Sequence, residues 1–116
     1  DLLNEYWTTF HLEAIADEIK RVSRGMARVS ISKRKQKEFK KIISDVEEFY
    51  TQVIKAHYSK TRPKALALSE YKKPLVDRIN TFYDENFDSP HISYMIDRFR
   101  RMIGSIHELN RLTFQH

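Results

Sequence analysis

The chain has 116 residues, 41% of them hydrophobic and 32% charged, and it contains no cysteine. This length and composition predict one globular domain over residues 1–116, with a core that needs neither disulfides nor a Cys-ligated metal. No apolar run approaches the roughly 20 residues of a transmembrane helix. Because the sequence begins at Asp1, we expect a domain excised from a longer protein. The lack of cysteine favours an intracellular setting, nuclear or cytoplasmic.

The first half of the chain predicts two long helices. The first is expected over about 3–27, with an apolar stripe whose register shifts after Ala14; the stripe comprises Leu3, Trp7, Phe10, Ala14, Ile15, Ile19, Val22 and Met26. The second is expected from Ser30 or Ser32 to about Tyr58. Its inward residues, spaced alternately four and three apart, are Phe39, Ile43, Val46, Tyr50, Val53 and His57, with Ile42 and Phe49 beside them.

The second half predicts a broken helix followed by a long one. Thr61 and Pro63 can start a short helix, and Pro74 predicts a break near Lys72 and Lys73 before a helix that ends at about Glu85. The expected inward residues of this limb are Leu68, Tyr71, Leu75, Ile79, Phe82 and Phe87.

The last helix is expected to begin at the cap sequence 88–90. Its stripe comprises Ile92, Met95, Ile96, Phe99, Met102, Ile103, Ile106, Leu109 and Asn110. Helices of this length, joined by short loops, indicate an all-α protein with an antiparallel four-helix bundle, or five helices if the chain separates near Pro74.

Positive charge is concentrated in the segment 20–41. This segment carries ten Lys or Arg residues and one acid, Glu38, so its net charge is +9 against +5 for the whole chain. The candidate polyanion- or partner-binding residues are Lys20, Arg21, Arg24, Arg28, Lys33, Arg34, Lys35, Lys37, Lys40 and Lys41. They are expected to surround the turn between the first two helices, and they suit phosphates or an acidic protein strip equally well. An ordinary solvated surface is the alternative.

Tyr6, Trp7 and Phe10 form a second candidate, an aromatic cluster near the start of the chain. Packing against the final helix is one interpretation. The other is a docking site for a partner helix or peptide, because exposed aromatic residues anchor such interfaces. Exposure of Trp7 distinguishes the two.

The segment 101–107 resembles, in the spacing of Arg101 and His107, the Arg-x(4–6)-His element of HEPN-type ribonucleases. The resemblance implies that these two residues would stabilise phosphate charge and transfer a proton without a metal. It covers seven residues and supports a metal-independent ribonuclease only as a remote alternative.

No metal or cofactor is expected, because the five histidines show no paired ligand spacing and the Glu-x-x-His pairs of di-iron bundles are missing. His57 lies on the inward stripe and is expected to be buried and hydrogen-bonded. The sequence therefore favours a non-catalytic protein-interaction domain, a recruitment or adaptor module, that binds an acidic or helical segment of another protein. Sequence-nonspecific binding of nucleic acid or chromatin through 20–41 is the alternative. A membrane partner is not expected, and homo-oligomerisation stays open.

Overall fold

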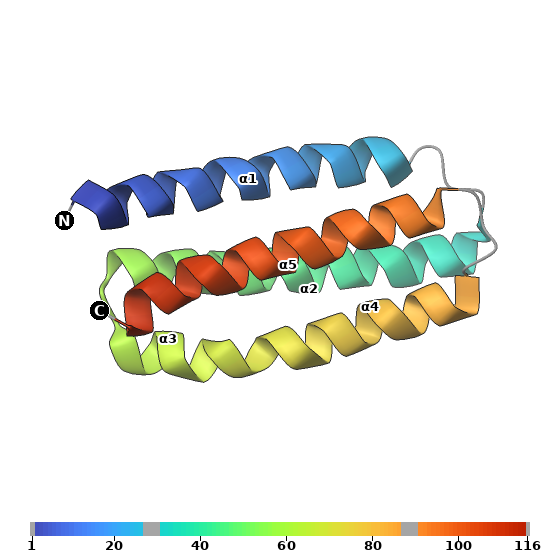
Figure 1. Ribbon diagram of the computed structural model, residues 1–116. Coiled ribbons are helices and arrows are strands. Elements are labelled where there is room, and N and C mark those ends of the chain that lie inside the picture. Colours follow the sequence, from blue (N-terminus) through green and yellow to red (C-terminus); the bar gives the residue numbers. More distant parts are fainter. Residues whose placement is uncertain (1, 27–30, 87–90, 116) are drawn as a thin grey trace.

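The computed structural model describes residues 2–26, 31–86 and 91–115, which form an all-α antiparallel bundle of four limbs (Figure 1). The first two limbs are α1 (Leu2–Met26) and α2 (Lys33–Tyr58). The third consists of α3 (Arg62–Leu68), a 3-10 turn η1 (Ser69–Tyr71) and α4 (Lys72–Asn86), and α5 (Ile92–Phe114) is the fourth. The predicted four-helix bundle is confirmed. The expected caps at 88–90 and the inward Phe87 lie outside the described residues.

The third limb breaks where the sequence predicts it. Pro74 is the third residue of α4, a position at which its missing N–H removes no intrahelical hydrogen bond. Pro63 occupies the equivalent first turn of α3. The turn η1 between them keeps the helical period, because Leu68 and Leu75, seven residues apart, are both buried. Tyr71, expected to point inward, faces Phe49 but is 56% exposed, so its predicted burial was wrong.

Helix α5 is the centre of the core, because every other limb packs against it. Its buried residues are Ile92, Met95, Ile96, Phe99, Met102, Ile103, Ile106, Leu109, Asn110 and Thr113. The Asn110 side chain donates a hydrogen bond from Nδ2 to the carbonyl of Ala65, 2.7 Å away, and so joins α5 to α3. The predicted stripe of the last helix is confirmed in full.

The buried face of α2 is rotated slightly from the predicted one. Ile42 and Phe49 are fully buried, whereas Ile43, Tyr50 and His57 are only half-buried. The reason is the position of the neighbours: α2 packs against α5 and the third limb, and this pair of neighbours selects the side of the wide apolar stripe that carries Ile42 and Phe49.

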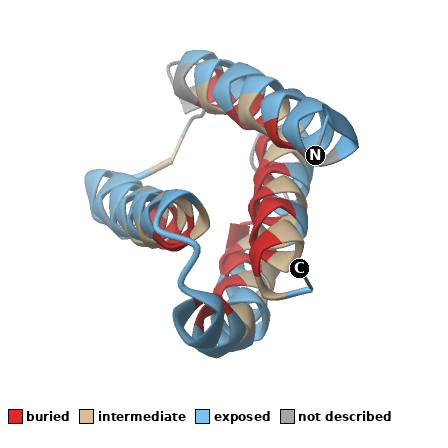
Figure 2. Ribbon diagram, turned by 90° about the vertical axis from the view of Figure 1, so that its left-hand side faces the viewer, coloured by how far each residue is buried: buried red, intermediate tan, exposed pale blue. Residues whose placement is uncertain are grey.

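The predicted inward face of α1 was wrong over its first half. Helix α1 packs chiefly along α5, through a seam formed by Thr8, Ile15, Glu18, Val22 and Gly25. The predicted residues Leu3, Trp7 and Phe10 are exposed on its outer side, as the exposed outer surface of α1 in Figure 2 illustrates. The seam keeps one register, because its buried residues Thr8, Ile15 and Val22 are seven residues apart, and the predicted register shift after Ala14 does not occur.

Candidate functional site

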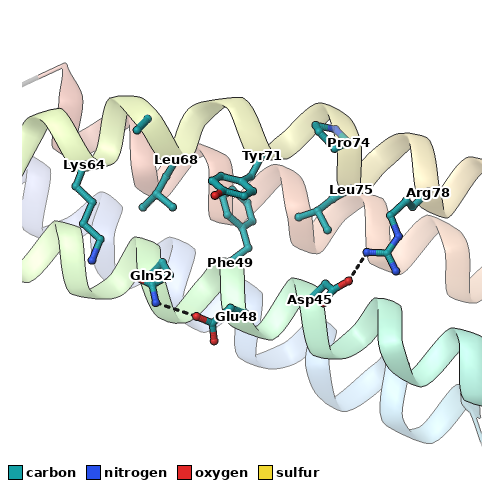
Figure 3. Close-up of a pocket in the computed structure, with 11 residues that line it drawn as sticks. Asp45, Glu48, Phe49, Gln52, Lys64, Leu68, Tyr71, Pro74, Leu75 and Arg78 are labelled. Atoms are coloured by element: carbon teal, nitrogen blue, oxygen red, sulfur yellow. Dashed lines mark hydrogen bonds and ion pairs between the residues drawn. The ribbon is translucent and has the colours of Figure 1, made fainter.

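An apolar groove lies between α2 and the third limb (Figure 3). Its cavity has a volume of about 640 Å³, within the roughly 300–1,000 Å³ of typical ligand pockets. Phe49 forms the wall on the α2 side. The opposite wall belongs to the third limb and is formed by Leu68, Tyr71, Pro74 and Leu75. The ring centroids of Phe49 and Tyr71 are 6.4 Å apart, so the two aromatic rings face each other across the groove.

The third limb passes through the turn η1 beside the groove. The Ser69 hydroxyl donates to the carbonyl of Leu66 at 2.5 Å, which supports the tight turn after α3. Small Ala67 lines the opening where a larger side chain would fill it. Phe49, Leu68 and Leu75 are buried at the bottom of the groove, whereas Ala67, Tyr71 and Pro74 are exposed at its mouth.

Charged side chains surround the groove unevenly. Asp45 and Glu48 stand on the α2 rim, and Lys64 stands on the α3 rim. An ion pair between Asp45 and Arg78 crosses the groove and closes one end, as drawn in Figure 3. Gln52 donates from Nε2 to Glu48 at 2.8 Å along α2. The groove is thus acidic along one edge, basic along the other and open at the end near Lys64.

The basic residues of 20–41 lie on two helices at one end of the bundle, where α1 ends and α2 begins (Figure 1). Arg28 lies outside the described residues. Among the nine that are described, Arg21 pairs with Glu18 and Lys35 pairs with Glu38 and Glu85. The other seven are exposed and form no ion pair with a described residue: Lys20, Arg24, Lys33, Arg34, Lys37, Lys40 and Lys41.

Lys35 has a structural role within this set. Its ammonium donates to Glu85 at 2.6 Å and so connects the start of α2 to the end of α4. This hydrogen bond raises the pKa of Lys35 above its ordinary value. Lys35 is therefore less available to a partner than its neighbours Lys33, Arg34 and Lys37.

The aromatic cluster on α1 is about half exposed to solvent. Tyr6 is 61% exposed, Trp7 41% and Phe10 49%. The Trp7 ring makes edge contacts with Tyr6 and Phe10, with centroid distances of 5.6 and 5.7 Å, and stacks on His11 at 6.2 Å. The interpretation that this cluster is buried against the final helix is therefore wrong. Its role as a docking site for a partner stays a prediction.

His57 is held between helices, as expected. Its Nε2 lies 3.2 Å from the Thr8 hydroxyl of α1, and its Nδ1 lies 2.8 Å from the Thr113 hydroxyl of α5. Burial lowers the pKa of His57. The imidazole therefore joins three helices in its neutral form.

The Arg101 and His107 side chains are not brought together on one face of α5. Six residues at 100° each place them about 120° apart around the helix. Arg101 instead lies 3.9 Å from Asp97, and His107 is half-buried, with no hydrogen-bond partner at Nδ1 among the described residues. Within the described ranges, no three His, Cys, Asp or Glu residues are arranged to hold a metal ion, and no helix is both long and apolar enough to cross a membrane.

Several polar residues of the α1–α5 contact were not predicted. Glu18 and Arg98 are only 10% and 18% exposed at their side chains, and their closest atoms are 3.3 Å apart. The spacing of charges along one helix cannot reveal an ion pair between two residues that are 80 positions apart in the chain. An acid on the face of α1 that packs against α5 is nevertheless a sign that a cation lies opposite.

Comparisons of the chain with protein-family models, curated proteins and solved structures gave no match. Its function is therefore inferred from the surfaces described above.

Proposed function

We propose that this chain is a non-catalytic protein-interaction domain that binds an amphipathic helix of another protein in the groove between α2 and the third limb. The observation that supports this most directly is the open apolar cavity of about 640 Å³ lined by Phe49, Leu68 and Leu75. The apolar residues at its mouth, Ala67, Tyr71 and Pro74, are exposed, and a concave apolar site of this kind is typical of a binding site. A groove between two antiparallel helices suits the apolar face of a third helix.

The charges at the rim specify the kind of helix. Acidic Asp45 and Glu48 on the α2 side favour basic residues along one edge of the partner, and Lys64 favours an acid along the other. The Asp45–Arg78 ion pair blocks one end, so the partner helix would enter from the end near Lys64. Apolar residues one turn apart in the partner would occupy the space between Phe49 and Leu75.

The test is to fill the groove without disturbing the core. Ala67 is exposed and lines the opening, so Ala67→Arg places a long charged side chain in the path of the partner. Leu66→Arg is the matched control, because Leu66 is also exposed on α3 but does not line the groove. Amphipathic helical peptides selected on the wild-type domain from a displayed library would then be measured against both variants.

The expected result is a loss of at least about tenfold in affinity for Ala67→Arg and no loss for Leu66→Arg. Because burial of apolar surface is the main driving force, the affinity should depend only weakly on salt. Three outcomes would contradict the proposal: no peptide is selected, the selected peptides bind Ala67→Arg as tightly as wild type, or their binding maps to segment 20–41.

Binding of nucleic acid through 20–41 is a second candidate, and one observation favours it. The first turn of α2 contains Lys33, Arg34 and Lys35 and no acid. Cations at a helix N-terminus oppose the helix dipole, at a cost of about 0.3–1 kcal/mol each. A bound polyanion would offset this repulsion. The test is binding of fluorescent duplex DNA and single-stranded RNA over a salt series, in which only a steep decline with salt would support this candidate.

A further inference from the structure

A second, smaller cavity lies between the end of α1 and the start of α5. Its volume is about 270 Å³, and it is lined by Arg21, Arg24, Gly25, His91 and Tyr94. Its walls come from a different pair of helices than those of the groove, so the two sites are separate. Among the described residues its lining contains two arginines, a histidine and a tyrosine, and no acid.

The cationic groups come from both helices. Arg24 is exposed and forms no ion pair with a described residue. Arg21 is held by Glu18, whose Oε1 accepts from Nη1 of Arg21 at 3.4 Å and from Nη1 of Arg98 at 3.3 Å. One carboxylate thus orients two guanidinium groups. Glu18 neutralises only part of the charge of Arg21 and Arg98, and Arg24 has no ion pair with a described residue, so these four described side chains together keep an excess positive charge.

Gly25 lies beside this cavity and sets how closely its two walls approach. It is buried in the seam, and a Cβ atom built at this position would lie 2.9 Å from Cγ of Met95. A glycine therefore permits α1 to approach α5 this closely, with Met95 packed against it.

The α5 wall contributes donors of its own. His91 precedes the helix with φ 67°, and its side chain makes no capping hydrogen bond, so the amides of the first turn are not capped by it. Tyr94 lies in that turn, and the guanidinium of Arg98 sits 4.9 Å from the centroid of its ring. The phenol, the imidazole and the helix start therefore border the same space as Arg21 and Arg24.

We propose that this cavity binds the phosphate group of a small phosphate monoester. Guanidinium groups match phosphate oxygens in geometry and charge, and the positive end of α5 adds to the attraction. A volume of about 270 Å³ accommodates a phosphate with a small substituent beside Tyr94 but is too small for a duplex. The site acts as a discrete pocket, in contrast to the diffuse surface formed by the cations of α2.

The test uses phenyl phosphate and inorganic phosphate as probes, with benzenesulfonate as a monoanion that carries the same ring. Each is titrated into the ¹⁵N-labelled domain, and the backbone amide shifts are followed. Arg24→Gln removes one cation of the pocket, and Lys40→Gln removes one exposed cation of α2 outside it. Thermal melts confirm that both variants are folded.

Saturable shifts at residues 91–95 and 21–25 are expected with both phosphates. Arg24→Gln should weaken binding at least about tenfold, because a hydrogen bond to a charged group is lost, and Lys40→Gln should leave it within about twofold. If both variants weaken binding equally, the attraction is a general surface effect and the proposal is wrong. It is also overturned if no titration saturates, or if benzenesulfonate binds as tightly as phenyl phosphate.

Discussion

Ile15→Ala should detach α1 from the bundle while α2 to α5 stay folded. Among the α1 residues whose burial the structure describes, Ile15 and Val22 are the only buried hydrophobic ones, and Leu12 and Ile19 pack against the core more loosely. Full burial of such a side chain contributes about 1.5–3 kcal/mol, so these two supply roughly 3–6 kcal/mol of the contact with α5. Truncation of a buried Ile to Ala costs about 2–5 kcal/mol. The change therefore removes a large share of the described apolar burial that holds α1 against α5.

Native-state hydrogen exchange measures this directly, because it reports the opening of each helix separately. In the wild type, amides of α1 should exchange through a lower-energy opening than those of α2 and α5. In Ile15→Ala they should lose almost all protection, while the amides of α2, α4 and α5 keep theirs.

Ile103→Ala is the matched control, because Ile103 has the same side chain and is also completely buried, but at the centre of α5. It should lower protection in every helix together, since all limbs pack against α5. If Ile15→Ala also lowers the protection of all helices equally, α1 unfolds only with the whole domain, and the reasoning from its narrow seam fails.

Two further predictions concern charge. Burial is the largest cause that lowers the pKa of His11, His57 and His107 below 6.5, so below pH 6.5 the native state binds fewer protons than the unfolded chain. The free energy of unfolding, measured in guanidinium chloride, should thus be constant above about pH 7 and fall from pH 6.5 to 5.5; a flat or rising profile would contradict this. For the nucleic-acid candidate, reversal of three unpaired cations of α2 to Glu should abolish DNA binding at low salt, whereas reversal of three exposed lysines elsewhere should weaken it only modestly. The first set is Lys33, Lys37 and Lys40, and the control set is Lys55, Lys72 and Lys73. Equal losses in the two sets would assign the binding to net charge alone.

The buried face of a helix can be predicted from the sequence where the helix has neighbours on several sides. Helix α5 is covered by all the other limbs, so its apolar pattern and its buried face coincide. Helix α1 has one main neighbour, and its most conspicuous residues, Trp7 and Phe10, are on the outside. Hydrophobicity gives the width of an apolar stripe, but the number of neighbours decides how much of it is buried.

The candidate sites were harder to predict for a related reason. Phe49, Leu68 and Leu75 were correctly predicted to face inward, but the cavity between them depends on how the break at η1 sets the third limb against α2. The cavity at Arg21 and Tyr94 likewise depends on the distance between α1 and α5. Spacing along the chain carries no information on either separation, whereas a buried glycine at 25 is a local sign of a close approach.

The different walls of the two proposed sites make them separable in one experiment. The groove is bounded by α2 and the third limb, and the phosphate pocket by α1 and α5. Detachment of α1 in Ile15→Ala should therefore abolish phosphate binding and leave the binding of a helical peptide unchanged. By linkage, phenyl phosphate at about 100 times its dissociation constant should stabilise docked α1 by about 2.7 kcal/mol. The phosphate pocket is complete only when α1 is docked on α5. The stabilisation should therefore appear as stronger exchange protection in α1 of the wild type and be largely missing in Arg24→Gln. A gain of the same size in Arg24→Gln would mean that the anion acts on the domain through general charge screening, without the pocket.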